Sequence, residues 1–136
     1  MVEDVPPGAV WEALCKDPLA VLCDVRTEAE WAFVGVPDLS SVGKRAVLIP
    51  WQVYPGMKRN EDFLDQLADA GVTPEHRVFF ICRSGGRSRA AAITAAKAGF
   101  ANAYNVAHGF DGPANGEGRR GAAAGWKAEG LPWRPR

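Results

Sequence analysis

Cysteine and histidine are scarce in this 136-residue chain, which has three of the first and two of the second. The cysteines are Cys15, Cys23 and Cys82, and they form neither a C-x-x-C pair nor a cluster with histidine. An odd number of cysteines at these spacings argues against a disulfide framework and against a structural zinc site. We therefore expect free thiols, no metal site and a location in the reducing cytoplasm.

An excess of charge of one sign is also lacking. The 16 basic and 16 acidic residues balance to a formal net charge of zero, and they are mixed along most of the chain. Such a chain has no general field to attract nucleic acid or an anionic membrane surface, so neither is an expected partner. Any preference for an anion must come from a local group of cations.

A long apolar segment is missing as well. The N-terminal stretch MVEDVPPGAVWEALCKD has early acidic residues and two prolines, where a targeting segment would have a basic start and an uninterrupted apolar run. We expect neither a secretory signal nor a transmembrane helix. The length is that of one domain, and residues 1–136 are expected to form one.

Short apolar runs that alternate with helical patterns make up most of the chain. The runs that predict strands are 20–23, 46–49, 78–81 and 103–106. Helices are expected over 28–33, 60–70 and 88–98, the second with Asn60 as N-cap and Gly71 as terminator. Strands that are apolar from end to end favour a mostly parallel sheet of about five short strands with helices on both faces. The predicted fold class is α/β.

The end of the chain has a different composition. Residues 109–121 are rich in glycine and polar side chains, which predicts a long loop. Residues 122–129 then have the composition of a short helix that would bury Trp126.

The segment CRSGGRSR, residues 82–89, joins the third apolar run to the third helical pattern. A strand, a tight glycine-containing loop and a helix N-terminus direct backbone N–H groups and the helix dipole toward one point. A cysteine at the start of such a loop is stabilised as the thiolate, its nucleophilic form. Gly85 and Gly86 are expected to adopt positive φ and to leave the approach to sulfur open. Three arginines within seven residues could bind an anionic substrate.

Cys82 is therefore the candidate nucleophile. Cys15 lies in a short helical pattern and Cys23 lies inside an apolar strand, so both are expected to be buried structural residues.

The spacing between the cysteine and the second arginine separates two classes of enzyme. Tyrosine and dual-specificity phosphatases have five residues between these two, whereas Cys82 and Arg87 have four between them. The shorter loop resembles the active-site loop of the rhodanese family, in which Cys-Arg-x-Gly-x-Arg is a frequent form. Residues 82–87 fit this form at every fixed position.

The resemblance covers about residues 5–133. The stretch DVRTEAEW, residues 24–31, is similar to the rhodanese signature Asp-x-Arg followed by an acidic and an aromatic residue. The stretch GWKAEGLP, residues 125–132, is similar to the closing Trp and Gly-x-Pro of the family. The chain departs from the family at three places. Residues 35–38 replace the usual Gly-His-Ile, and His108 replaces the first glycine of a Gly-Gly turn. Residues 111–121 form a glycine-rich insertion.

The resemblance implies a rhodanese-like fold and sulfurtransferase activity without metal or organic cofactor. Cys82 would attack the outer sulfur of a small-molecule donor such as thiosulfate and hold that sulfur as a persulfide. The acceptor would be cyanide in an assay, a thiol in the cell or a sulfur-accepting protein. Donor and persulfide would contact the loop residues Arg83, Ser84, Gly85, Gly86, Arg87 and Ser88.

Within that loop, Arg83 and Arg87 would bind the sulfonate of the donor, and backbone N–H groups would stabilise the sulfur anions. Asp24 and Arg26 would support the pocket wall, with Arg26 paired to Glu28 or Glu30.

Other functions stay open from the residues alone. The same scaffold could serve a cysteine-dependent phosphatase or an arsenate reductase, or a non-catalytic module that binds a partner through the 111–121 loop. His108 would either tune the thiol or remain a solvated turn residue.

Overall fold

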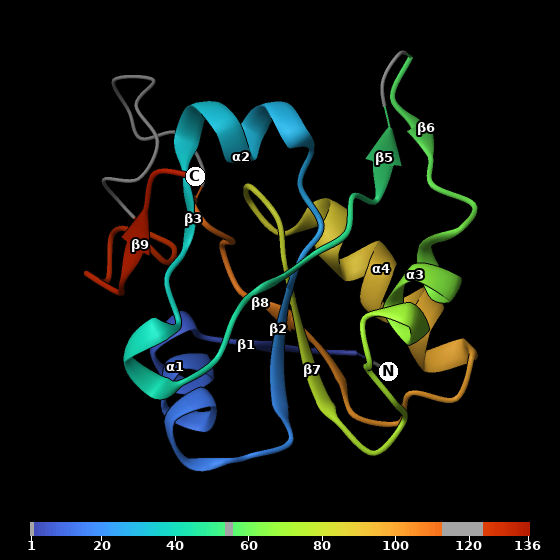
Figure 1. Ribbon diagram of the computed structural model, residues 1–136, viewed down its shortest axis with the longest axis horizontal. Coiled ribbons are helices and arrows are strands. Elements are labelled where there is room, and N and C mark those ends of the chain that lie inside the picture. The colour runs from blue at the N-terminus through green and yellow to red at the C-terminus, as the bar shows by residue number, and fades with distance from the viewer. Residues whose placement is uncertain (1, 54–55, 113–123) are drawn as a thin grey trace.

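The computed structural model describes residues 2–53, 56–112 and 124–136 (Figure 1). The strands are β1 (Glu3–Val5), β2 (Ala20–Asp24), β3 (Val36–Pro37), β4 (Val47–Leu48), β5 (Gln52–Val53), β6 (Lys58–Arg59), β7 (Arg77–Ile81), β8 (Ala103–Val106) and β9 (Trp133–Arg134). The helices are α1 (Pro7–Lys16), α2 (Glu28–Val34), α3 (Phe63–Asp69) and α4 (Gly86–Lys97), with a short 3-10 helix η1 (Ser40–Val42).

Five of these strands form one parallel sheet in the order β1-β8-β7-β2-β4. The predicted α/β class and five-stranded parallel sheet are confirmed. β2 and β7 lie at the centre and pair along their whole length, from Ala20 opposite Arg77 to Asp24 opposite Ile81. The carboxyl ends of both strands therefore meet at one edge of the sheet, below α2 and beside the loop that leads into α4 (Figure 1).

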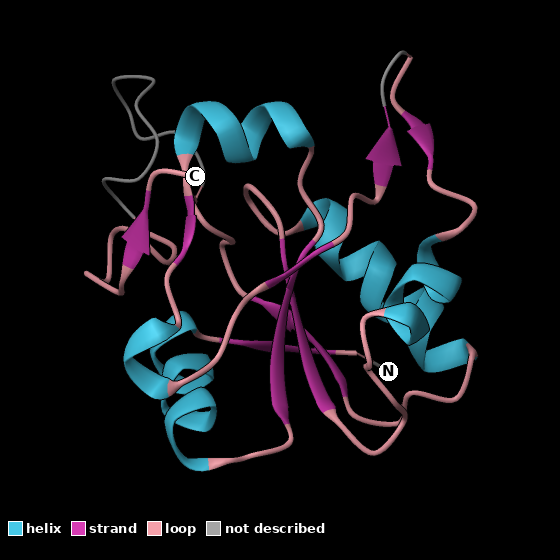
Figure 2. Cartoon of the chain, viewed as in Figure 1, coloured by secondary structure: helices cyan, strands magenta, loops and turns pink. Residues whose placement is uncertain are grey.

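Side chains of the central strands alternate between two cores. Leu22 packs with Val10 and Leu14 of α1, whereas its neighbour Cys23 packs in the second core, which α3 and α4 cover. The period of two residues along a strand produces this division. Figure 2 shows α1 on one side of the strands and α3 and α4 on the other, as predicted.

The predicted strands differ from the observed ones mainly at their ends. Residues 103–106 form β8 as predicted, 20–23 and 78–81 each gain one residue, and 46–49 shorten to β4. β1 was not predicted, and it supplies the fifth strand by pairing with β8. The antiparallel pairs β3–β9 and β5–β6 were not predicted either. Their strands are two residues long, which is too short for a periodic pattern.

The prediction that Asn60 caps the helix over 60–70 is wrong. α3 begins at Phe63, and Asp62 stands at the N-cap position. The Oδ1 of Asn60 accepts a hydrogen bond from the N–H of Asp62 at 3.1 Å, and its amide group donates to the carbonyl of Pro50 at 2.9 Å. Local side-chain bonding of this kind closes a turn before the helix in place of capping it. Gly71 adopts a positive φ of +85° after the helix, as expected of a terminator.

The helix predicted over 122–129 does not form in the part of it that the structure describes. Residues 124–129 form turns, and Gly125 has a φ of +104°, outside the helical range. The N–H groups of Trp126 and Lys127 donate to the carbonyls of Gly109 and Phe110, so the start of this segment bonds to a distant loop, and only a single turn closes from Glu129 to Gly125. Trp126 is fully buried, as predicted. Of the predicted insertion at 111–121, only Asp111 and Gly112 belong to the described residues.

Within the described part of the chain, no helix has both the length and the apolar composition needed to cross a membrane.

Candidate active site

Cys82 directly follows β7, at the edge of the sheet where the central strands end, and only 1% of its surface is exposed. The backbone N–H of Gly85 donates to its Sγ at 3.1 Å. Gly85 is the N-cap residue of α4 and has a φ of +116°. The expectation of a positive φ holds for Gly85 but is wrong for Gly86, which is already the first helical residue. The helix predicted over 88–98 thus starts at Gly86 and directs its free N-terminal N–H groups toward the loop.

A second hydrogen-bonding group on the sulfur comes from Ser88, which is fully buried. Its Oγ lies 3.2 Å from Sγ of Cys82 and 2.5 Å from Oδ1 of Asn105. The amide nitrogen of Asn105 donates to the carboxylate of Asp4 at 2.9 Å, which fixes the amide with its oxygen toward Ser88. A hydroxyl has one proton, so Ser88 donates to one acceptor at a time: Asn105, the sulfur, or the carbonyl of Gly85 at 3.3 Å. The chain of contacts joins Cys82 to the surface of β1.

The sequence did not indicate Asn105 or Asp4 as parts of the site. The available signal was a polar residue inside the apolar run Ala103–Val106, because a buried amide requires partners. Asp4 and Asn105 face each other across the β1–β8 pair.

The base of the loop is bound to the segment that follows β8. The N–H of Phe110 donates to the carbonyl of Cys82 at 2.8 Å, and that of Asp111 donates to the carbonyl of Arg83 at 3.0 Å. A Cβ on Gly109 would lie 2.5 Å from the carbonyl oxygen of Cys82, so only glycine permits this approach. His108, just before it, is exposed and has a φ of +65°.

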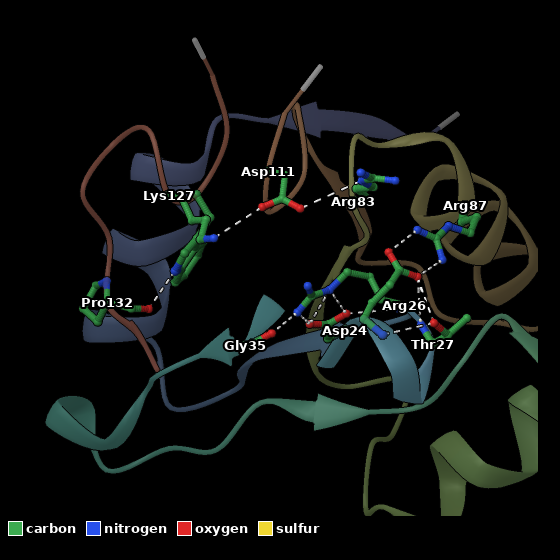
Figure 3. A network of polar contacts seen from close by, with 11 residues as sticks. Asp24, Arg26, Thr27, Gly35, Arg83, Arg87, Asp111, Lys127 and Pro132 are labelled. Carbon is green, nitrogen blue, oxygen red and sulfur yellow. Dashed lines mark hydrogen bonds and ion pairs between the residues drawn. The ribbon is translucent and has the colours of Figure 1, made fainter. Parts of the chain in front are cut away.

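Arg87 forms a bidentate pair with Glu30 of α2, at 2.6 and 2.9 Å (Figure 3). Glu30 also completes a capping box with Thr27, which starts α2. Partial burial alone would raise the pKa of Glu30, but hydrogen bonds from Arg87 and Thr27 outweigh it and lower the pKa to about 2. The same pair raises the pKa of Arg87. Glu30 therefore ties the N-terminus of α2 to the first turn of α4.

The other two loop arginines also lie beside carboxylates. The Nε of Arg83 is 4.0 Å from Asp111, whose second oxygen is 3.7 Å from the Nζ of Lys127 (Figure 3). Arg89 forms an ion pair with Asp4. The side chain of Arg83 is the most exposed of the three, at 51%.

Asp24 and Arg26 form an ion pair whose two side chains are fully buried. The Nη2 of Arg26 lies 2.7 Å from Asp24 and donates to the carbonyl of Gly35, also at 2.7 Å, while its guanidinium group lies 4.2 Å from the centre of the Phe110 ring. The prediction that Arg26 pairs with Glu28 or Glu30 is wrong, because its partner is Asp24. Asp24 ends β2 two residues before Arg26, and its carboxylate accepts hydrogen bonds from the backbone N–H, the Nε and the Nη2 of Arg26.

The remaining cysteines differ from one another. Cys23 is buried, as expected, and burial followed by the charge of Asp24 raises the pKa of its thiol well above the usual value. Cys15 is exposed, so its predicted burial is wrong. It lies on the outer side of α1, whose buried residues are Pro7, Val10 and Leu14. Among the described residues, no three His, Cys, Asp or Glu side chains gather as a metal-binding set.

Comparisons with known proteins agree with this geometry. The crystal structure of Rv0390 from M. tuberculosis is 49% identical and covers 99% of this chain and 98% of its own, with a TM-score of 0.89. Residues 7–136 match the family model of the STR4 middle domain. Rhodanese-like domain-containing protein 4 of Arabidopsis thaliana, a chloroplastic protein, is 32% identical over 88% of this chain. The chain belongs to the rhodanese-like family.

Two further proteins are similar to this rhodanese-like chain over nearly all of its length. The Rickettsia conorii protein RC0915 is 35% identical over 97% of both chains, whereas the match spans only 23% of the Arabidopsis protein. The polysulfide-sulfur transferase homodimer of Wolinella succinogenes is 24% identical, with a TM-score of 0.68 over 99% of this chain and 80% of its own. At that identity the likeness shows the fold alone.

Proposed function

We propose that this rhodanese-like chain is a sulfurtransferase that carries a sulfane sulfur on Cys82. The main support for this proposal is that Sγ of Cys82 accepts a hydrogen bond from the N–H of Gly85 at 3.1 Å and lies 3.2 Å from the hydroxyl oxygen of Ser88. The N–H of Gly85 and the N-terminus of α4 suit a thiolate or a persulfide anion, and Ser88 adds a donor to the sulfur when its proton is not on Asn105. The cytoplasmic location expected from the free cysteines belongs to the same proposal.

The reaction has two steps. The thiolate of Cys82 attacks the outer sulfur of the donor, a new S–S bond forms, and the donor's own S–S bond breaks with its electron pair leaving on sulfite or on a thiolate. A thiophilic acceptor then attacks the outer sulfur of the Cys82 persulfide, and the thiolate of Cys82 is restored. The negative charge stays on sulfur in both steps, so the donors of the loop act as an oxyanion hole would.

The loop arginines have different roles in this proposal. Arg83 is half exposed at the entrance and makes the first contact with an anionic donor. Arg87 is held by Glu30, so it orders the loop and reaches the donor only by exchanging part of that pair. Asp24 and Arg26 act through position: they bind Gly35 and so hold the end of α2, whose first turn carries Glu30.

Mass spectrometry of the intact protein tests the proposal. The experiment uses a Cys15→Ser background, because Cys15 is exposed and would react with sulfur donors on its own. Incubation with thiosulfate or with a low-molecular-weight persulfide should add about 32 Da, the mass of one sulfur, and cyanide should remove it as thiocyanate. The Cys82→Ser variant in the same background should gain nothing.

A folded protein that gains no sulfur from either donor would contradict the proposal. Steady hydrolysis of an aryl phosphate that depends on Cys82 would support the phosphatase instead.

A further inference from the structure

Each arginine of the active-site loop already has a carboxylate partner within the protein. Arg83, Arg87 and Arg89 each lie in an ion pair, and the three carboxylates come from the segment after β8, from α2 and from β1. A doubly charged donor such as thiosulfate therefore meets no loop arginine without a competing carboxylate. Binding such a donor requires that one of these pairs open.

The ion pair between Arg83 and Asp111 should break most easily, because Arg83 is the most exposed of the three arginines and this pair is the longest, at 4.0 Å. The carboxylate of Asp111, however, is held in place when Arg83 moves away from it. The backbone N–H of Asp111 is bonded to the carbonyl of Arg83 itself at 3.0 Å. Only 10% of the Asp111 side chain is exposed, and Lys127 holds its other oxygen from the side away from Arg83 (Figure 3).

A sulfonate that binds the Nε side of Arg83 thus competes with a fixed carboxylate, which lies 4.0 Å from Nε. Juxtaposed like charges lower affinity strongly where the solvent is partly excluded. The persulfide of an uncharged or cationic thiol carries less negative charge than thiosulfate and has no sulfonate to place beside Asp111. Selection between donors through such a repulsive element is a known route to specificity.

We propose that Asp111 makes this site discriminate against dianionic sulfur donors and in favour of small persulfides. The inference rests on the proposed sulfurtransferase function and names its donor class. In the favoured reaction the Cys82 thiolate attacks the outer sulfur of R–S–SH, giving Cys82–S–SH and the thiolate R–S⁻. No oxidant or reductant is needed, because the S–S bond that breaks is replaced by the one that forms.

The Asp111→Asn variant removes the charge and keeps the shape. We expect kcat/KM for thiosulfate to rise about tenfold through a lower KM, and that for cysteamine persulfide to change less than about twofold. Asp111→Glu keeps the charge and should keep the wild-type ratio. Asp69→Asn, a change of the same kind at an exposed position in the last turn of α3, serves as the matched control. Thermal unfolding of each variant checks that it is folded.

A second readout does not depend on sulfur transfer. In the Cys15→Ser background, sulfate should protect Cys82 from alkylation by iodoacetamide at a concentration about tenfold lower in Asp111→Asn than in the parent. An unchanged donor ratio and unchanged protection would overturn the inference, as would equal effects of Asp111→Asn and Asp111→Glu. If no donor loads Cys82, the proposed function fails, while the sulfate arm still tests the role of Asp111.

Discussion

Gly85 and Gly86 are neighbours in the candidate active-site loop with different conformational requirements. Gly85 needs a φ of +116° to direct its N–H at the sulfur, whereas Gly86 is the first residue of α4 and has open space where a Cβ would be. The sequence pattern predicts a flexible pair, but a helix boundary between the two residues divides their roles. Which of the two adjacent glycines has the positive φ depends on where α4 begins.

The two alanine variants should therefore differ. Gly85→Ala should lower the free energy of unfolding by about 1–3 kcal/mol, because an L-residue is strained at that φ. Gly86→Ala should leave stability unchanged or raise it by up to about 1 kcal/mol, because alanine favours helix. Urea unfolding of both variants measures the difference, and equal losses would contradict the assignment of the helix start.

At the scale of elements, Glu30 couples α2 to α4. It completes the capping box of α2 with Thr27 and binds Arg87 in the first turn of α4, 57 residues away. Its pKa is lowered to about 2 in the folded chain, from a usual value of 4.5. A lowered pKa means that the ionised form stabilises the fold. This contribution is complete above about pH 4.5 and is lost as the pH falls toward 2.

The Glu30→Gln variant should reproduce that loss at neutral pH. We expect its free energy of unfolding to be lower than that of the parent by about 2–3 kcal/mol at pH 7, and the difference to fall by more than half at pH 3. Denaturant unfolding at the two pH values measures it. Glu12→Gln, which removes an exposed ion pair with Lys16 on α1, should change little at either pH. A pH-independent difference for Glu30→Gln would contradict the role of its ionisation.

At the scale of the whole molecule, the buried pair of Asp24 and Arg26 joins three parts of the fold. It lies at the end of the central strand β2, binds the carbonyl of Gly35 after α2, and stacks on Phe110, whose N–H holds the carbonyl of Cys82. The sheet, α2 and the loop base are thereby fixed relative to one another. The position of the candidate active-site loop therefore depends on this ion pair, although the pair itself need not contact the sulfur.

Arg26→Met should destabilise the fold by about 3–5 kcal/mol, because it leaves the carboxylate of Asp24 buried and unpaired. The double variant Asp24→Asn, Arg26→Met should lose less than the sum of the two single changes, since neither charge is then left alone. Thermal or urea unfolding of the four proteins gives the coupling. Additive losses would show that the pair does not act as a unit.

Several features of this protein followed from the sequence by itself. The α/β class, the central strands and the position of Cys82 between a strand and a helix follow from local patterns of apolar residues and glycine, which neighbouring residues determine. The rhodanese-like family followed from the loop spacing together with Asp24 and Arg26. That residues 1–136 form a single domain, and that the loop binds the donor, stay predictions.

The partners of the charged residues were decided only by the tertiary structure. Glu30 and Arg87 are 57 residues apart, and Asp4 and Asn105 are 101 apart, so no local pattern could pair them. The helices α2 and α4 follow β2 and β7, whose carboxyl ends meet at one edge of the sheet, which brings Glu30 to Arg87. Asp4 and Asn105 lie opposite each other because β1 pairs with β8. The sequence alone thus located the candidate nucleophile, and the fold decided which carboxylate each arginine of its loop would meet.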